Sequence, residues 1–227
     1  MKYFILSILS YQLLYAGITI HQKEFTVKKP IKSWIEFKNE NLTRQEYDYS
    51  CGSASLSTIL KYYYSLDIDE KDILDAVLES KGYDISKKAK LEEENTTLSF
   101  FDLASYAQTK GFKAVGLALD MKSLSKLKAP VILFVKIRKN EHFSIYKNMD
   151  KNYVYMADPS FGNIKVKLSK FKEMFYQRDD LKYPGKILAI IPIIDEQKDD
   201  IRYSFMDIEK SSDFIYDTIH DNIMRIK

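Results

Sequence analysis

The chain has 227 residues, of which 45% are hydrophobic, enough to bury the core of one ordinary domain and to exclude a disordered chain. Lysine and arginine (35) nearly balance aspartate and glutamate (32), so a formal net charge of +3 gives no electrostatic case for nucleic acid as a partner. The single cysteine, Cys51, excludes an internal disulfide framework and a zinc site built from several thiolates. No short metal-ligand spacing supports a site made from Cys51 with histidine and aspartate, so we expect no metal and no cofactor.

The first residues have the pattern of an export signal. Lys2 precedes the apolar run FILSILSYQLL, and the small residue Ala16 follows at a plausible cleavage site. The run is interrupted by Gln12 and is shorter than the roughly 20 apolar residues that a membrane-spanning helix needs. We therefore expect residues 1–17 to be a signal peptide and the chain to be exported, most simply to a periplasm, with no integral membrane domain after signal removal. An uncleaved N-terminal anchor and a buried helix are the alternatives.

The first half of the chain is predicted to be mainly helical. Residues 18–43 form a polar, extended lead-in that contains one apolar patch, SWIEF. Apolar residues at helical spacing then predict a helix from Cys51 to about Tyr64. A second helix, KDILDAVLES, follows the capping-box spacing of Asp67 and Glu70 and ends at Gly82. After a charged surface loop over 83–96, Thr97 or Ser99 caps a third helix that ends at Gly111.

The second half changes to strand-like runs of apolar and aromatic residues. These are FKAVGLALD, VILFVKIR, HFSIYKN, YVYMADP, GNIKVKLS and KILAIIPI, with a short helix MKSLSKLK after the first and a helix KFKEMFYQ capped by Ser169 before the last. Helices first and an antiparallel sheet second predict an α+β fold in which N-terminal helices pack on a C-terminal sheet. We expect one domain over residues 44–194 and a charged C-terminal tail over 195–227 that includes an amphipathic helix.

Cys51 lies where a helix is predicted to begin, in the stretch QEYDYSCGSASLSTIL. Unpaired N–H groups and the helix dipole favour negative charge there, which suits a reactive thiolate better than a buried structural thiol. Gly52 is expected to leave room for a substrate backbone.

Two further residues fit a thiol-dependent site. His142 opens a predicted strand and shares its face with Ser144 and Tyr146, while Phe143 and Ile145 face the core. Asp158 ends the neighbouring hairpin strand, within reach of the far ring nitrogen of His142, where a carboxylate would fix the tautomer. The Cys51 N–H and the side-chain amide of Gln45 are candidate donors to an oxyanion.

The motifs QEYDYSCGSASLSTIL, GF at 111–112, KLKAPVILFV, HFSIY and MADPSFGNIKVKLSKFKEMF resemble the C39 peptidases over about residues 44–194. This family has the papain-like cysteine peptidase fold and is best known as the leader-processing domain of peptide-exporting transporters. The resemblance implies Cys51 as nucleophile, His142 as general base, Asp158 as orienting acid and Gln45 as oxyanion-hole amide. The family commonly has aspartate just before the cysteine, where this chain has Ser50.

The resemblance also implies a function. The family cuts leader peptides after a double glycine, so we expect a cysteine endopeptidase whose partner is an exported peptide or protein, in a stand-alone protein similar to those that accompany secretion or functional-amyloid systems. Two other functions stay open at this stage. One is a peptide-binding module that does not cleave, and the other is a Cys-His amidase or acyltransferase that acts on a different acyl bond.

Overall fold

The computed structural model describes residues 17–22, 25–30, 33–85, 98–137, 139–193 and 195–207, with the backbone alone for 17–30. Residues 1–16 of the predicted signal peptide, most of the 83–96 loop and the amphipathic helix of the tail lie outside these residues. The chain divides into two units, Met1–Glu40 and Asn41–Lys227, which are described separately.

The first unit contains a two-stranded antiparallel sheet and a short helix. Strand β1 (Gly17–Gln22) pairs with β2 (Phe25–Pro30), with Gly17 opposite Pro30. Helix α2 (Trp34–Asn39) begins where Ser33 and Glu36 form a reciprocal capping box. The expectation of a wholly extended lead-in is therefore wrong for the apolar patch, because this capping pair satisfies the first N–H groups of a helix.

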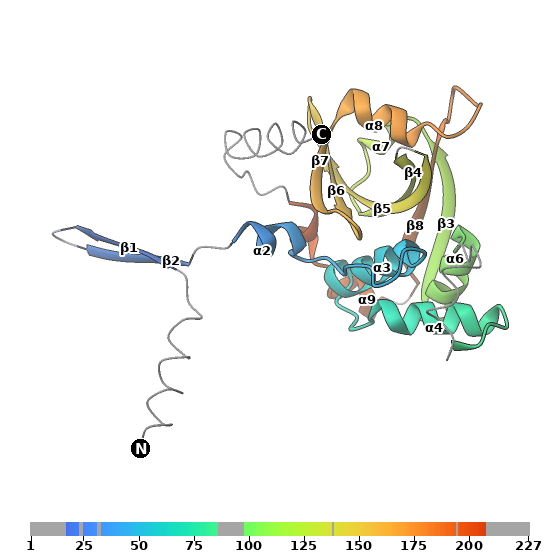
Figure 1. Ribbon diagram of the computed structural model, residues 1–227, viewed down its shortest axis with the longest axis horizontal. Helices are drawn as coiled ribbons and strands as arrows, with labels where there is room; N and C mark the ends of the chain where they lie inside the picture. The colour runs from blue at the N-terminus through green and yellow to red at the C-terminus, as the bar shows by residue number, and fades with distance from the viewer. Residues whose placement is uncertain are drawn as a thin grey trace, which may run out of the picture. The chain divides into compact units, whose positions relative to one another are not determined.

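A six-stranded antiparallel sheet forms the centre of the second unit (Figure 1). The strands are β3 (Phe112–Leu119), β4 (Val131–Ile137), β5 (Asn140–Met149), β6 (Tyr153–Asp158), β7 (Gly162–Lys167) and β8 (Gly185–Pro192). They lie in the order β3-β8-β4-β5-β6-β7, so the last strand in sequence inserts between β3 and β4. All six strands were expected from the sequence, and each is confirmed.

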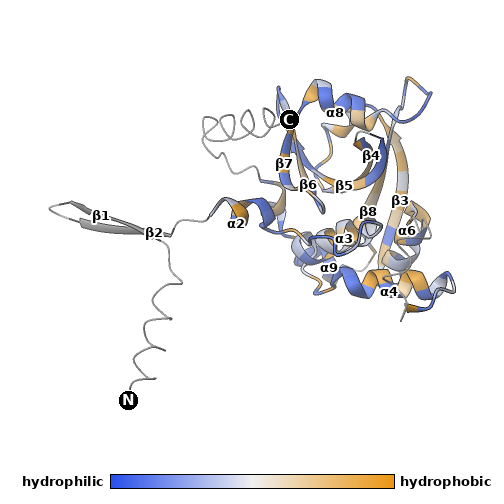
Figure 2. Cartoon of the chain, viewed as in Figure 1, coloured by the Kyte–Doolittle hydropathy of each residue, from blue (hydrophilic) through white to orange (hydrophobic). Residues whose placement is uncertain are grey.

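Helices cover both faces of this sheet (Figure 1). One face packs against α3 (Cys51–Thr58) and its π-helical extension (Ile59–Tyr63), α4 (Glu70–Ser80) and α6 (Phe100–Thr109); the other packs against α7 (Met121–Leu124) and α8 (Leu168–Phe175). Hydrophobic and hydrophilic residues alternate along α4 and α8 in Figure 2, as expected of helices with one buried face. The predicted α+β arrangement is confirmed, with one addition: α7 and α8 give the sheet a second hydrophobic layer.

Two of the predicted helix caps are wrong. The capping box of α4 is formed by Asp69 and Asp72, two residues later than expected, while the buried carboxylate of Glu70 accepts the backbone N–H of Glu46 at 3.1 Å. Helix α8 already begins at Leu168, so Ser169 lies inside its first turn and is not its cap. By contrast, Ser99 caps α6 through a capping box with Asp102, as expected.

The described part of the predicted tail packs on the domain. It contains α9 (Glu196–Asp199) and a short 3-10 helix (Tyr203–Met206), and Phe205 of that helix is 2% exposed within the helix-side core. The backbone N–H of Arg202 donates to the carbonyl of Tyr63, at the end of the π-helical turn. Residues up to at least Asp207 therefore contribute to the folded unit. Within the described residues, no helix combines the length and the hydropathy needed to cross a membrane.

Candidate active site

Cys51 is the first residue of α3 and is partly exposed. The helix begins there because a tight turn over Tyr47–Ser50 reverses the chain: the Ser50 N–H and hydroxyl both donate to the Tyr47 carbonyl, at 3.1 and 2.7 Å, and the Tyr47 N–H donates to the Ser50 oxygen at 3.1 Å. Ser50 itself is fully buried. The position confirms the predicted placement of the thiol at a helix N-terminus, where the dipole favours an anion.

Gly52 has a different role from the one expected. It is buried, and a Cβ built on it would lie 3.1 Å from the ring of Phe143 and 3.3 Å from Leu103. The expectation that it opens space for substrate is wrong, because the space beside its α-carbon is filled by these side chains. The glycine instead lets the first turn of α3 approach β5 closely, which brings Cys51 to the strand that carries His142.

His142 and Asp158 form a hydrogen-bonded pair. The ring Nε2 lies 3.1 and 3.2 Å from the two carboxylate oxygens of Asp158, and since a carboxylate can only accept, Nε2 carries the proton. The register of β5 and β6, with Ile145 opposite Ala157, brings the two side chains together on neighbouring strands as predicted. The imidazole side chain is 11% exposed and the carboxylate is fully buried.

The turn that follows β6 holds the Asp158 carboxylate. One of its oxygens, Oδ1, accepts the backbone N–H groups of Ser160 and Phe161, each at 2.9 Å. The ring of Phe161 lies edge-on to the imidazole, with 6.3 Å between the ring centroids. A buried carboxylate with several donors is fully satisfied, so it stays in place and constrains the ring of His142.

The charge state of His142 depends on both of its neighbours. Burial of the ring lowers its pKa, but hydrogen bonds to Asp158 and to the Cys51 side chain outweigh burial and raise the pKa of His142 to about 10. Because Nε2 is engaged by Asp158, Nδ1 is the ring nitrogen that remains for the sulfur. Both the carboxylate and the thiol thus act on the imidazole, as general base catalysis in a Cys-His-Asp arrangement requires.

A metal ion needs several ligand side chains arranged around it. Among the described residues, no group of three histidine, cysteine or carboxylate side chains is arranged to hold a metal ion.

The face of β5 that carries His142 is buried: Ser144 and Tyr146, on the same face, are 0% and 1% exposed. It packs against the second hydrophobic layer, which the sequence pattern alone did not predict. Phe143 and Ile145 do face the helix-side core, as expected.

Gln45 lies in the segment before α3, and its hydrogen bonds run to two parts of the site. Its Nε2 donates to the Tyr47 carbonyl at 3.0 Å, and its Oε1 accepts the hydroxyl of Ser160 at 2.5 Å. Its backbone N–H donates to the Pro159 carbonyl at 3.2 Å. The glutamine is thereby tied both to the turn that starts α3 and to the turn that holds Asp158.

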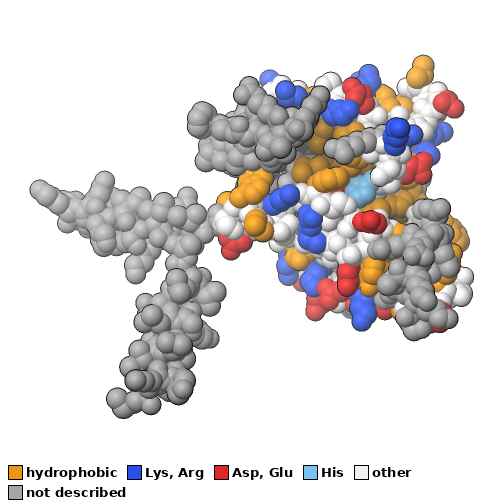
Figure 3. Space-filling model, in the orientation of Figure 1, with side chains coloured by type: hydrophobic (Ala, Val, Ile, Leu, Met, Phe, Trp, Pro, Cys, Tyr) orange, Lys and Arg blue, Asp and Glu red, His pale blue; other side chains and the backbone are white. Residues whose placement is uncertain are grey.

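A pocket of about 370 Å³ opens beside Cys51 and His142. Its floor includes Phe100, Phe134 and Phe143, whose ring centroids lie 5.2–6.4 Å apart, and its rim carries Glu141 and Lys186. In Figure 3 the described surface shows hydrophobic patches with lysine, arginine and acidic side chains interspersed among them. With three phenylalanines and both an acidic and a basic side chain in its lining, the pocket offers apolar contact and no concentrated positive charge.

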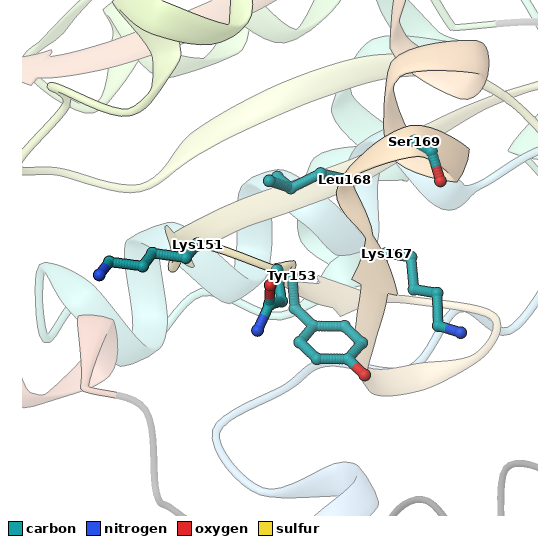
Figure 4. Close-up of a pocket in the computed structure, with 6 residues that line it drawn as sticks. Lys151, Tyr153, Lys167, Leu168 and Ser169 are labelled. Carbon is teal, nitrogen blue, oxygen red and sulfur yellow. The ribbon is translucent and has the colours of Figure 1, made fainter.

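A second pocket lies away from the catalytic residues, where β6 begins and β7 leads into α8. It is lined by Lys151, Asn152, Tyr153, Lys167, Leu168 and Ser169. Figure 4 shows the side chains of Lys151 and Lys167 extending in opposite directions on either side of the Tyr153 ring. Their cationic groups point away from each other, so the two lysines do not form a cluster of positive charge that could bind an anionic ligand.

Ser160, Phe161 and Phe134 were not predicted as parts of the site. The Asp-Pro-Ser sequence gave only a turn signal for Ser160 and Phe161. Phe134 lies in an apolar strand. The sequence pattern of that strand does not distinguish a residue that lines a pocket from one that lies in the core. A strand residue lines a pocket only where the helix packed on that strand does not cover it completely, and the sequence of the strand does not show this.

Comparison with known proteins identifies the family. The Peptidase C39 family matches residues 39–178. The "Probable functional amyloid protease FapD" of Pseudomonas fluorescens is 32% identical over 143 residues, covering 63% of this chain and 60% of the relative, and its Pseudomonas aeruginosa counterpart is 30% identical. This chain thus spans about three fifths of the length of these curated relatives.

A solved structure, a double glycine motif protease from an AMS/PCAT transporter in complex with its leader peptide, is 22% identical with a TM-score of 0.48, covering 66% of this chain and 90% of that one. The family match covers more than half of the residues and includes Cys51, His142, Asp158 and Gln45. The chain therefore belongs to the peptidase C39 family.

Proposed function

We propose that this protein is an exported cysteine endopeptidase in which Cys51 is the nucleophile, His142 the general base and Asp158 the orienting acid. The observation that supports this most directly is the imidazole of His142, which is hydrogen-bonded to Asp158 and lines the same pocket as Cys51, whose side chain helps to raise the pKa of the ring. Family membership supports the same assignment.

In the proposed reaction, His142 takes the thiol proton and the resulting imidazolium stabilises the Cys51 thiolate. The thiolate attacks the carbonyl carbon of the scissile peptide bond and forms a tetrahedral intermediate. That intermediate collapses to a thioester as His142 protonates the departing amine. Water, deprotonated by His142, then attacks the thioester and releases the carboxylic acid and the thiol.

The oxyanion of each tetrahedral intermediate needs donors. The Cys51 N–H at the start of α3 is one, because the first N–H groups of a helix lack partners within the helix. The second is Gln45, whose side-chain amide has one N–H on the Tyr47 carbonyl and a second N–H to offer.

The proposed substrate is an exported peptide or protein cut after a Gly-Gly sequence. The specificity is carried over from the family, and the names of the Pseudomonas relatives suggest a secreted functional-amyloid component as partner. The phenylalanine-floored pocket beside Cys51 would take apolar side chains that precede the two glycines. Export, through the predicted signal peptide, would bring the enzyme to the compartment of such a partner.

The test uses a synthetic peptide with an apolar segment followed by Gly-Gly, and a matched peptide with Val-Val in place of Gly-Gly. Wild-type protein should cut the first peptide once, after the second glycine, and leave the second intact. Cys51→Ala should lose at least about 10³-fold in rate while keeping the wild-type thermal denaturation curve. Cleavage by Cys51→Ala at the wild-type rate would refute the proposal.

A further inference from the structure

Ser160 connects two residues of the proposed catalytic site that belong to distant parts of the chain. Its hydroxyl donates to Oε1 of Gln45, and its backbone N–H donates to Oδ1 of Asp158. Its carbonyl accepts a hydrogen bond from the Arg44 guanidinium. The Ser160 backbone is thus held on both sides while its side chain reaches across to Gln45.

A glutamine can act in an oxyanion hole in only one orientation. Its carboxamide has a donor end and an acceptor end of nearly equal size, and a half-turn of the terminal bond exchanges them. With Oε1 toward the reacting carbonyl, the developing negative charge would meet another negative dipole end. Surrounding hydrogen bonds must therefore decide which end faces the substrate.

Two hydrogen bonds hold the carboxamide in one orientation. The Ser160 hydroxyl donates to Oε1 at 2.5 Å and keeps the acceptor end toward the Asp158 turn. At the donor end, Nε2 meets the Tyr47 carbonyl, which can only accept. A rotated carboxamide would set its oxygen against that carbonyl.

We propose that Ser160 is a positioning residue that fixes the orientation of the Gln45 carboxamide, so that an N–H faces the oxyanion. This rests on the proposed function, in which Gln45 stabilises the tetrahedral intermediate. Ser160 does not touch the reacting atoms; it acts through Gln45.

The Ser160 hydroxyl bonds to Gln45, whereas its backbone N–H bonds to Asp158. The experiment must separate the effect on Gln45 from an effect on Asp158. Alkylation of Cys51 by iodoacetamide takes place at a saturated carbon and forms no oxyanion, so it reports the Cys51–His142–Asp158 unit alone. Acylation of Cys51 by the p-nitrophenyl ester of N-acetylglycylglycine forms an oxyanion and needs no natural substrate. Comparing the alkylation rate with the acylation rate isolates the contribution of the Gln45 carboxamide to oxyanion stabilisation.

The informative variants are Ser160→Thr and Ser160→Val, which have the same shape, although only threonine can donate. We expect Ser160→Val to lower kcat for the ester about 10–100-fold, with KM and the alkylation rate within about twofold of wild type. Ser160→Thr should keep kcat within about threefold. Adding Ser160→Val to Gln45→Ala should cost little more than Gln45→Ala alone, because the residue to be positioned is then absent.

Equal kcat for the valine and threonine variants would overturn the proposal, as would parallel loss of acylation and alkylation, which would assign the effect to Asp158. Additive losses in the double variant would overturn it too. Failure of the proposed peptidase function looks different: wild type would acylate Cys51 with the ester but leave the Gly-Gly peptide uncut.

Discussion

Replacing Asp158 with asparagine changes the tautomer of His142 while keeping the shape of the turn. The asparagine oxygen would keep the two backbone N–H groups of Ser160 and Phe161 that Oδ1 accepts now. Its NH₂ group would then face Nε2 of His142, where the wild type has a carboxylate oxygen at 3.1 Å. Nε2 would have to accept, so the ring proton would move to Nδ1, the nitrogen that must accept the thiol proton.

The size of the effect follows from the pKa of His142. The pKa of His142 rises from its ordinary value of 6.5 to about 10, and this rise already includes the opposing effect of burial. It corresponds to a preference of about 5 kcal/mol for the protonated ring in the folded protein, relative to a free imidazole. Asp158 is the larger of the two favourable partners, so its loss should lower the pKa of His142. The imidazolium would no longer support the thiolate, and together with the wrong tautomer we expect about 10³–10⁴-fold slower peptide cleavage.

The assay measures iodoacetamide alkylation and peptide cleavage as functions of pH, with NMR titration of the His142 ring assigned through His142→Ala. Asp150→Asn is the matched control, because Asp150 Oδ1 accepts the backbone N–H groups of Asn152 and Tyr153 at 2.7 Å in another turn. The control should behave as wild type in all three measurements. If Asp158→Asn leaves both the His142 titration and the cleavage rate unchanged, the proposed role of the pair is wrong.

Three further predictions concern stability. The raised pKa of His142 means that the folded protein holds a proton that the unfolded chain releases, so the unfolding free energy should be highest below pH 6.5 and fall as pH rises toward about 10, as measured by urea denaturation at several pH values. Gly185→Ala should cost about 3 kcal/mol or more, because its Cβ would lie 2.1 Å from a fully buried aromatic ring, whereas Gly116→Ala, with no atom within 4 Å, should be neutral or slightly stabilising. Phe205→Ala should cost about 3–5 kcal/mol because the ring is 2% exposed, while Tyr203→Ala, 66% exposed, should cost under about 1 kcal/mol; equal losses would mean that the segment after β8 does not pack as described.

The order of elements and the pairing of His142 with Asp158 were predictable because local signals were strong. Runs of apolar and aromatic residues marked every strand of the sheet, and a cysteine after a turn marked the start of α3. The pairing of His142 with Asp158 followed from the hairpin, since a short turn between two strands limits which residues can be neighbours.

Other features were not predictable because they depend on contacts distant in sequence. The cap of α4 was placed two residues early because Asp67, Asp69 and Glu70 are all acidic, and only packing shows that Glu70 is turned inward to Glu46. Likewise, Gly52 carries the same sequence signal whether its α-carbon faces substrate or Phe143. In each case local chemistry offered several equivalent choices and tertiary packing selected one.

The site also shows how residues far apart in sequence, Cys51 and His142, can be held rigidly relative to one another. Cys51 is fixed by close packing of α3 on β5 at Gly52, and His142 by the buried carboxylate of Asp158. These two attachments would be independent if Gln45 and Ser160 did not join the turn before α3 to the turn after β6. Because a displacement of either turn strains that hydrogen bond, Gln45 should move together with Cys51 and His142. Substitutions at the 45–160 contact should therefore alter turnover before they alter folding.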